Sequence, residues 1–152
     1  MPQVEIARPS HLRFGEPGFY EAYGAAWGFR DLLVSFFAPD GVYTDKASQV
    51  LVEGQHLLDR FMKVYLRFSP NCTVTFTSVH EHPGGFTAEW VWAGTNDGPL
   101  RLHGFECPCD GSHFSIEGVS VCSVDEKGRI TSHTDYWDSE ALLRIWRKAP
   151  AT

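Results

Sequence analysis

Two alternating strands joined by a tight turn are visible in the stretch Val119-Ser-Val-Cys-Ser-Val-Asp-Glu-Lys-Gly-Arg-Ile-Thr-Ser-His-Thr-Asp-Tyr-Trp-Asp138. Residues 125–128 have turn chemistry, and Gly128 can take a positive φ. Residues 119–124 and 130–137 are therefore predicted to pair as an antiparallel hairpin. Because side chains alternate along a strand, one face of the second strand carries Thr131, His133, Asp135 and Trp137. The sequence thus predicts a histidine, a carboxylate and an indole in line.

Elsewhere in the chain, the predicted helices come mostly before the strands. Apolar spacing predicts a helix over residues 17–37, divided near residues 24–28, and a second amphipathic helix over about residues 53–68. Strands are predicted at 42–46, 72–80 and 86–95, then an irregular excursion over 96–111, the hairpin and a last helix over 139–147. Parallel sheets need strands and helices that alternate throughout, so we predict an α+β domain with a bent antiparallel sheet covered by helices.

Composition limits the classes of function. A chain of 152 residues with 43% hydrophobic content is the size of one domain, residues 1–152, and 14% aromatic residues favour a pocket for an organic ligand. The net charge of -6 comes with scattered Lys and Arg, so we predict no nucleic-acid partner. Residues 1–9 lack the pattern of a secretory leader, and no segment could span a bilayer, so we predict a cytoplasmic protein without a membrane partner.

Cysteine and histidine spacing gives little support for a metal. The four cysteines are too few for a secreted disulfide framework, and we expect them to be reduced. Cys107-Pro-Cys109 lies between His103 and His113, but zinc sites usually separate paired cysteines by about two to four residues. His80-Glu-His82 leads into Pro-Gly-Gly and is typical of a solvated hairpin tip. We predict no metal and no cofactor.

Several motifs together resemble the SnoaL-like branch of the nuclear transport factor 2-like superfamily. They are Phe36-Phe-Ala-Pro-Asp-Gly-Val-Tyr-Thr-Asp45, Gly54 before a helix, Trp90-Val-Trp-Ala-Gly-Thr95, and the terminal Asp-Glu-Lys-Gly-Arg-Ile…Tyr-Trp-Asp-Ser-Glu-Ala-Leu-Leu pattern. The resemblance spans roughly residues 20–146. It implies a cone-shaped α+β barrel in which a curved mixed, mainly antiparallel sheet and amphipathic helices enclose an apolar pocket. Relatives include polyketide cyclases, ketosteroid isomerases, dehydratases, limonene-type epoxide hydrolases and members with no known enzymatic activity, so the fold does not choose the reaction.

The resemblance indicates a role for Asp45. In ketosteroid isomerases a carboxylate at the end of the first strand, after a similar Phe-Ala-Asp-Asp turn, is the general base, and Asp45 matches its position. A carboxylate at the mouth of an apolar cavity is partly desolvated, which raises its pKa and makes it a better base near neutrality. The alternative is an ordinary strand-end Asp that accepts turn hydrogen bonds.

The resemblance also places His133, Asp135 and Trp137 in the pocket. In SnoaL-type cyclases an acid on the last strand acts with a histidine on the preceding strand, and Asp135 matches that acid. Residues 119–124 contain no histidine, so His133 or His103 would have to substitute. The alternative is that His133 and Asp135 only satisfy each other's hydrogen bonds.

Trp90 and Trp92 share one strand face and, compared with the isomerases, point into the cavity, where paired indoles would sandwich a flat substrate. Core packing explains them equally well. We assign substrate binding to Tyr43, Trp90, Trp92, His103 and Trp137. Glu89, on the opposite face, is expected at the surface of a homodimer. The epoxide hydrolases hold water with an Asp-Arg-Asp arrangement, and the pocket strands contain no arginine.

The sequence therefore predicts a cofactor-independent isomerase, cyclase or dehydratase that acts on an apolar, ring-containing carbonyl compound, polyketide-like or terpenoid-like. Asp45 would remove a proton next to the carbonyl, and His133 and Asp135 would polarise or protonate the enolate oxygen. The alternative is a non-catalytic module of the same fold that binds a small ligand or forms a dimer.

Overall fold

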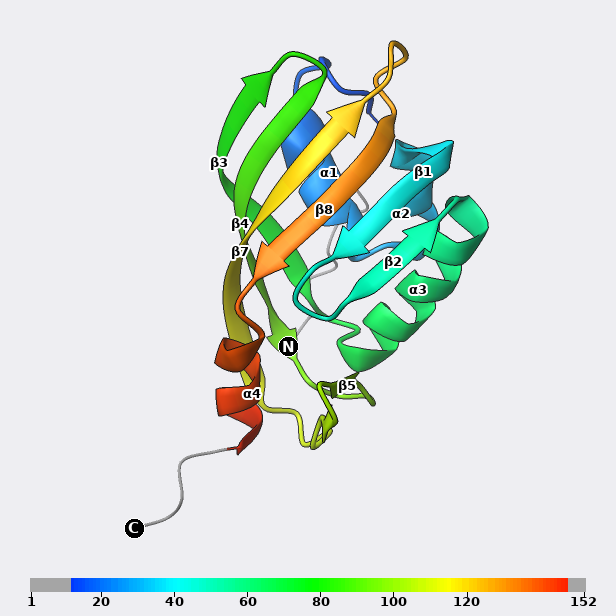
Figure 1. Cartoon of the computed structure of the whole chain (residues 1–152). Coiled ribbons are helices and arrows are strands. Elements are labelled where there is room, and N and C mark those ends of the chain that lie inside the picture. Colours follow the sequence, from blue (N-terminus) through cyan, green and yellow to red (C-terminus); the bar gives the residue numbers. More distant parts are fainter. Residues whose placement is uncertain (1–11, 148–152) are drawn as a thin grey trace, which may run out of the picture.

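The computed structural model describes residues 12–147 and shows an α+β fold of helices packed on one curved sheet (Figure 1). The ends of the predicted domain of residues 1–152, including the segment 1–9, extend outside the described residues. The elements in chain order are α1 (Phe19–Ala26), α2 (Arg30–Phe36), β1 (Phe37–Asp45), β2 (Val50–Glu53), α3 (Gln55–Phe68), β3 (Thr73–His82), β4 (Gly85–Thr95), β5 (Arg101–Leu102), β6 (Phe105–Glu106), β7 (His113–Val124), β8 (Ile130–Trp137) and α4 (Ser139–Arg147).

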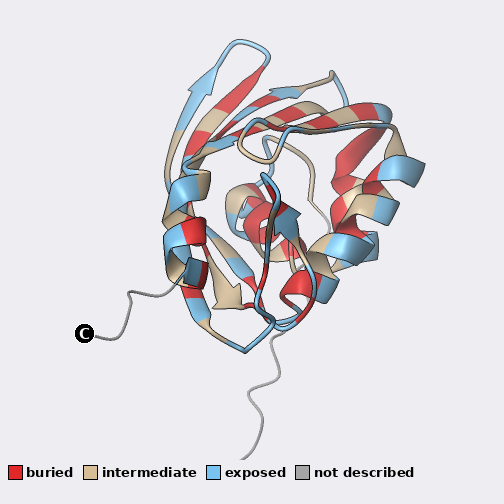
Figure 2. Ribbon diagram, turned by 60° about the horizontal axis from the view of Figure 1, so that its bottom comes forward, coloured by how far each residue is buried: buried red, intermediate tan, exposed pale blue. Residues whose placement is uncertain are grey.

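Six strands form the main sheet in the order β2-β1-β8-β7-β4-β3. Only β1 and β8 pair in parallel; the other neighbours are antiparallel, so the sheet is mixed and mainly antiparallel, as predicted. The sheet is not closed, because its edge strands β2 and β3 do not pair with each other. Helix α1 packs on β3 and α3 packs on β1 and β2, so the helices cover the inner side of this open, curved sheet (Figures 1 and 2).

The divided first helix is confirmed, since α1 ends at Ala26 and α2 begins at Arg30. Gly24 lets α1 approach the sheet closely, because a Cβ there would lie 2.8 Å from the carbonyl oxygen of Val74. The last helix is also confirmed: Asp138 caps it by accepting the backbone N–H of Glu140 at 3.0 Å.

Two strand predictions were wrong in their bounds, and one strand was not predicted. Strand β1 begins at Phe37 rather than at residue 42, because the Pro39-Asp40-Gly41 turn signal marks an irregularity inside the strand: its register with β8 shifts between Phe37 and Val42. Strand β2 lies where a loop was predicted, and β7 begins at His113 rather than at residue 119. The short strands β5 and β6 form a hairpin within the excursion.

From His133 onward, burial on β8 follows the predicted alternation, since His133 and Asp135 are buried and Tyr136 is exposed, whereas Ile130 of the opposite face is also buried. On the neighbouring strand, Gly118 allows the indole of Trp90 to lie across β7, since a Cβ there would meet the ring at 2.3 Å. These two features direct polar and aromatic side chains to the inner side of the sheet.

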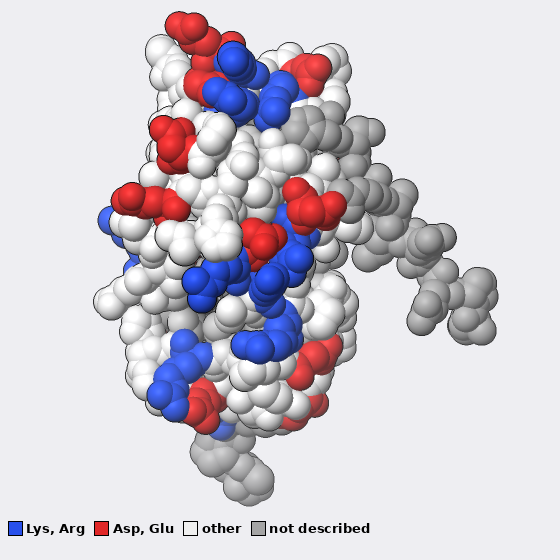
Figure 3. Space-filling view, turned by 90° about the vertical axis from the view of Figure 1, so that its right-hand side faces the viewer, with Lys and Arg blue, Asp and Glu red and all other residues white. Residues whose placement is uncertain are grey.

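The outer surface mixes charges of both signs. On the side that carries α3, groups of Lys and Arg lie beside Asp and Glu (Figure 3), and Arg30 pairs with Asp59 at 2.9 Å. Within residues 12–147, no helix combines the length and the apolar character needed to cross a bilayer.

Candidate active site

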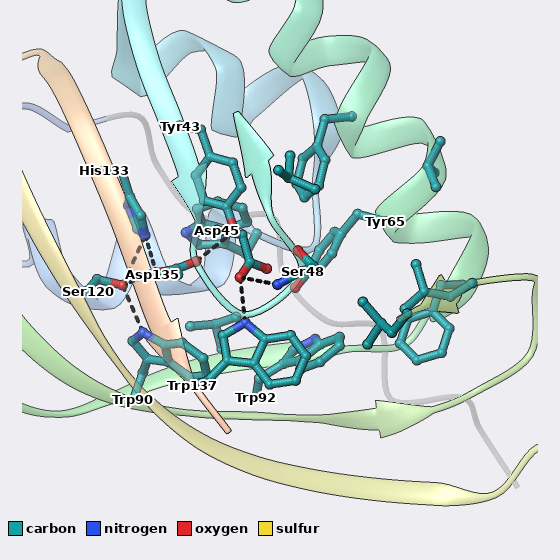
Figure 4. Close-up of a pocket in the computed structure, with 18 of the residues that line it drawn as sticks. Tyr43, Asp45, Ser48, Tyr65, Trp90, Trp92, Ser120, His133, Asp135 and Trp137 are labelled. Atoms are coloured by element: carbon teal, nitrogen blue, oxygen red, sulfur yellow. Dashed lines mark hydrogen bonds and ion pairs between the residues drawn. The ribbon is translucent and has the colours of Figure 1, made fainter. Parts of the chain in front are cut away.

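A cavity of about 250 Å³ lies between the inner side of the sheet and helix α3 (Figure 4). Its walls are mainly aromatic, with a few polar groups on one side. The lining residues are Trp27, Tyr43, Asp45, Ser48, Val50, Phe61, Val64, Tyr65, Phe68, Val74, Phe76, Trp90, Trp92, Leu100, Arg101, Leu102, Ser120, His133, Asp135 and Trp137.

The parallel pairing of β1 and β8 positions the predicted acid–base residues. Tyr43 is the register partner of His133, and Asp45 is the register partner of Asp135. All four line the cavity. The side chains are nearly inaccessible to solvent: Asp45 is 7%, His133 2% and Asp135 9% exposed. One wall of the cavity therefore holds two buried carboxylates on adjacent strands.

Asp135 accepts hydrogen bonds from three groups. The Tyr43 hydroxyl donates to Oδ2 at 2.7 Å, and the Ser120 hydroxyl donates to Oδ1. His133 Nε2 also lies 2.7 Å from Oδ1. Ser120 is itself held in place, because the Trp90 indole donates to its oxygen at 2.8 Å and leaves the hydroxyl proton for Asp135. Figure 4 shows this chain from Trp90 through Ser120 to the carboxylate.

His133 and Asp135 form a buried ion pair. Burial alone would lower the pKa of His133, but the negative charge and hydrogen bond of Asp135 outweigh burial and raise this pKa to about 10. Burial would likewise raise the pKa of Asp135, yet the His133 charge and the hydrogen bonds from Ser120 and Tyr43 lower it below its ordinary 3.8. The other ring nitrogen, Nδ1, lies 2.7 Å from the Tyr23 hydroxyl, so both imidazolium N–H groups have partners.

Asp45 has different surroundings. Three N–H groups donate hydrogen bonds to its Oδ1 atom: the backbone N–H groups of Ala47 at 2.9 Å and Ser48 at 3.2 Å, and the indole N–H of Trp137 at 2.9 Å. Burial is the largest influence and raises the pKa of Asp45 above 3.8, hydrogen bonds from Ser48 and Trp137 oppose this rise, and the charge of Asp135 adds to it. None of these three N–H groups donates to the Oδ2 atom.

The structure brings most of the predicted binding residues to the cavity. Tyr43, Trp90, Trp92 and Trp137 all line it. His103 does not: it lies at a turn with φ of +50°, is exposed, and its Nε2 contacts the carbonyl oxygen of Ala47 at 2.9 Å. Glu89 is exposed on the outer side of the sheet.

Sequence reasoning missed Ser120 and Trp27, which line the cavity, and Tyr23, whose hydroxyl contacts His133. Ser120 occupies the inward face of β7, where the cyclase comparison led us to search only for a histidine. Its place in the alternation of β7 was a usable signal. Tyr23 and Trp27 belong to α1 and its end, and their distance in sequence from β8 gave no signal.

The cysteine loop contains polar contacts of its own. The Asn96 side-chain amide donates to Cys107 Sγ at 3.3 Å, and Cys109 is exposed. Across residues 12–147 no three His, Cys, Asp or Glu side chains gather in a way that could hold a metal ion.

Comparison with known families agrees with this architecture. The model of the SnoaL-like domain matches residues 18–133, most of the chain. The chain belongs to the SnoaL-like domain family. The match ends at His133, so the family segment includes Asp45 and Ser120 but stops before Asp135. No curated protein matches the sequence.

Solved structures share the SnoaL-like fold at low sequence identity. A protein with a ketosteroid isomerase-like fold from Catenulispora acidiphila, in complex with trimethylamine, aligns with a TM-score of 0.73 at 23% identity, over 88% of this chain and 95% of that chain. A protein described as a SnoaL-like polyketide cyclase, from Jannaschia sp. CCS1, aligns with a TM-score of 0.70 at 20% identity, over 84% of this chain and 88% of that chain. A phenazine biosynthesis-related protein from Pseudomonas aeruginosa aligns with a TM-score of 0.58 at 16% identity, over 81% and 79%. At these identities the likeness concerns the fold.

Proposed function

We propose that this SnoaL-like chain is an enzyme of the isomerase, cyclase or dehydratase kind that moves a proton on an apolar, ring-containing carbonyl compound without a cofactor. The observation that carries the proposal is the pair of register partners Asp45 and Asp135 on the wall of one aromatic cavity. Their surroundings favour opposite protonation behaviour, which is a frequent arrangement for an acid and a base.

In this proposal Asp45 is the general base. Its raised pKa makes it a stronger proton acceptor than an exposed Asp, and its Oδ1 atom is fixed by three N–H groups. Those donors hold the carboxylate without supplying a proton to it. Oδ2 would then accept a proton from the carbon next to the substrate carbonyl, and the electrons of that C–H bond would form the enolate.

His133 and Asp135 would return the proton. The buried pair shares one proton between Nε2 and Oδ1 over 2.7 Å, and Asp135 is the member with more exposure to the cavity. We therefore assign the source of the proton to the His133 imidazolium and the contact with the substrate to Asp135: the Nε2 proton would move to Oδ1, and Asp135 would pass its proton from there to the substrate. This division refines the equal roles predicted from the sequence.

The size of the cavity favours a small substrate. At about 250 Å³ it falls just below the usual range of about 300–1,000 Å³ for pockets that take drug-sized ligands. A flat compound of two fused rings would suit the surrounding indoles and phenols. Polyketide-like and terpenoid-like compounds of this size both fit the description.

The competing proposal is a non-catalytic binding module. The aromatic cavity supports binding of a flat ligand by itself, and an ion pair such as His133–Asp135 can serve only to satisfy buried polar groups. The raised pKa of Asp45 favours the enzyme, because a binding site for an apolar ligand gains nothing from a buried carboxylate that binds protons readily.

We also propose that the protein is a cytoplasmic homodimer formed through the outer side of the sheet. Two exposed apolar side chains, Val121 and Tyr136, lie there on adjacent strands, near Glu89. Sedimentation of the wild type and of a Tyr136→Lys variant would test this interface, since a charge there should shift a dimer toward monomers.

Proton exchange in D2O tests the catalytic proposal without knowledge of the natural substrate. The probe is 1-tetralone, a two-ring ketone whose hydrogens next to the carbonyl exchange slowly without a catalyst. The wild type should accelerate their replacement by deuterium, as followed by proton NMR. A protein that binds the ketone but leaves its exchange rate unchanged would favour the binding module.

A further inference from the structure

Four tryptophans line the cavity, and each indole carries one N–H that can donate but not accept. Two of these donors have acceptors in the protein. Trp90 donates to Ser120, and Trp137 donates to Asp45. Among residues 12–147, the N–H groups of Trp27 and Trp92 form no hydrogen bond of standard geometry. These two donors differ in how the protein covers them.

The Trp92 nitrogen is fully covered by protein and interacts with the Tyr65 hydroxyl. Trp27 as a residue is more deeply buried, with only 4% of its surface exposed. Its nitrogen, however, is not among the polar atoms of the described residues that the protein covers completely and leaves without a partner. Trp27 lines the cavity, so this partly uncovered N–H belongs to a side chain that borders the cavity space.

The packing around Trp27 fixes the direction of that N–H. Its ring centroid lies 5.2 Å from that of His133, 5.4 Å from that of Tyr43 and 5.9 Å from that of Tyr65. A ring held on several sides cannot rotate freely, so the donor is oriented before a ligand arrives. It also lies beside the wall that carries Asp135.

The polar network on that wall has no donor to spare for a ligand. The Tyr43 hydroxyl and the Ser120 hydroxyl both donate to Asp135. The Nε2–H of the His133 imidazolium points to the same carboxylate. An ionised Asp135 can only accept. The carbonyl oxygen of a bound substrate therefore needs a donor from elsewhere in the cavity.

We infer that the Trp27 indole N–H donates a hydrogen bond to the carbonyl oxygen of the substrate. This inference rests on the proposed function. When Asp45 takes the proton, the C–H electron pair becomes the enolate double bond and negative charge moves to the oxygen. Trp27 stabilises that charge and keeps its own proton. A fixed donor aimed at developing charge accelerates such a step more than it tightens ground-state binding.

The test compares 1-tetralone with tetralin, which has the same two rings but no oxygen. The probe is the indole region of a ¹⁵N-correlated proton NMR spectrum, where the five tryptophans of the chain each give one signal. We expect the Trp27 indole proton to move downfield by several tenths of a ppm with 1-tetralone and to move much less with tetralin. Trp146 is the internal control, because its N–H is also unpartnered but lies outside the cavity lining.

Two matched variants provide the second readout. Trp27→Phe should weaken binding of 1-tetralone about fivefold and slow its proton exchange about 10²-fold, with tetralin binding unchanged. Trp146→Phe should change none of these quantities. If Trp27→Phe fails to fold, the wild-type spectra still decide the matter.

The outcomes separate this inference from the proposed function. Equal shifts of the Trp27 signal with both ligands would overturn the inference, since ring contact alone would explain them; exchange that still depends on Asp45 would leave the proposed function standing. If neither ligand moves any cavity indole signal, no small ring compound enters the cavity, and both the inference and the proposed function fail.

Discussion

Asp45 and Asp135 are register partners on adjacent strands, line the same cavity and are almost equally buried, yet their pKa values move in opposite directions. Burial raises the pKa of both. The difference comes from their partners: Asp45 meets uncharged donors, which are N–H groups and the Ser48 side chain, whereas Asp135 faces the imidazolium of His133 and two hydroxyl groups.

The comparison shows that a neutral donor and a cation act differently on a buried carboxylate. Neutral N–H groups orient Asp45 without cancelling the cost of its charge, so its affinity for a proton increases. A cation at 2.7 Å cancels much of that cost for Asp135. The surroundings of Asp45 suit a general base, and those of Asp135 keep its carboxylate ionised.

The largest expected effect is on proton transfer. Asp45→Asn keeps the shape of the side chain and removes its basicity, so exchange of 1-tetralone should fall by two to four orders of magnitude. Asp138→Asn, an exposed position outside the cavity, is the control and should exchange at the wild-type rate. A folded Asp45→Asn protein with full exchange activity would remove Asp45 from the mechanism.

The next effect is on stability, where substitution of Asp135 should have the larger effect and substitution of Asp45 the smaller one. Asp135→Asn leaves His133 without its counter-charge and should cost about 3 kcal/mol in the free energy of unfolding at pH 7. Asp45→Asn should cost little, because the raised pKa of Asp45 means that its ionised form already destabilises the fold. Urea unfolding of both variants checks this, and equal losses would contradict the proposed difference between the two sites.

The pH dependence of stability should show the ion pair directly. The folded pKa of His133 is raised to about 10, so its contribution is complete below its unfolded pKa of about 6.5 and is lost as pH rises from there toward 10. Asp135 has a lowered pKa, so its contribution disappears only as pH falls below about 3.8. Between pH 6 and 10, the free energy of unfolding should therefore decrease in the wild type and stay nearly constant in Asp135→Asn. Parallel curves would mean that the pair does not form.

The smallest effect concerns one donor of the network. Tyr43→Phe removes the hydroxyl that donates to Oδ2 of Asp135 and should cost about 1 kcal/mol of stability. It should also raise the pKa of Asp135, since a bond to the ionised form is lost. Phe61, which packs near Tyr43 at 5.0 Å between ring centroids, provides a control in Phe61→Leu, where the Asp135 pKa should not change. A rise in both variants would point to altered packing instead.

Local periodicity was enough to predict much of this site. Alternation on β8 placed His133 and Asp135 on one face, and the strand-end position of Asp45 was read from the family resemblance. The register that makes Asp45 and Asp135 partners joins residues 90 positions apart in sequence, and no local pattern encodes it.

Other features depended on contacts that a single sequence does not display. Ser120 takes the position where a histidine was sought, and only its contact with Asp135 gives it importance. The inward direction of Trp27 follows from the path of the chain after α1. His103 was misplaced although residues 100–102 of the excursion do line the cavity, because the turn conformation at His103 carries its side chain to the surface. The first helical segment was predicted to extend to residue 37, although strand β1 already begins at Phe37.

The opposite behaviour of the two carboxylates is measured most directly by ¹³C NMR titration of the Asp side-chain carboxyl groups, with Asp45→Asn and Asp135→Asn used to assign the two signals. The structure predicts that Asp45 titrates above 3.8 and that Asp135 remains ionised below 3.8. If the two groups titrate together, or if Asp135 takes up its proton first as the pH falls, the assignment of Asp45 as the base and of Asp135 as the ionised partner of His133 is contradicted.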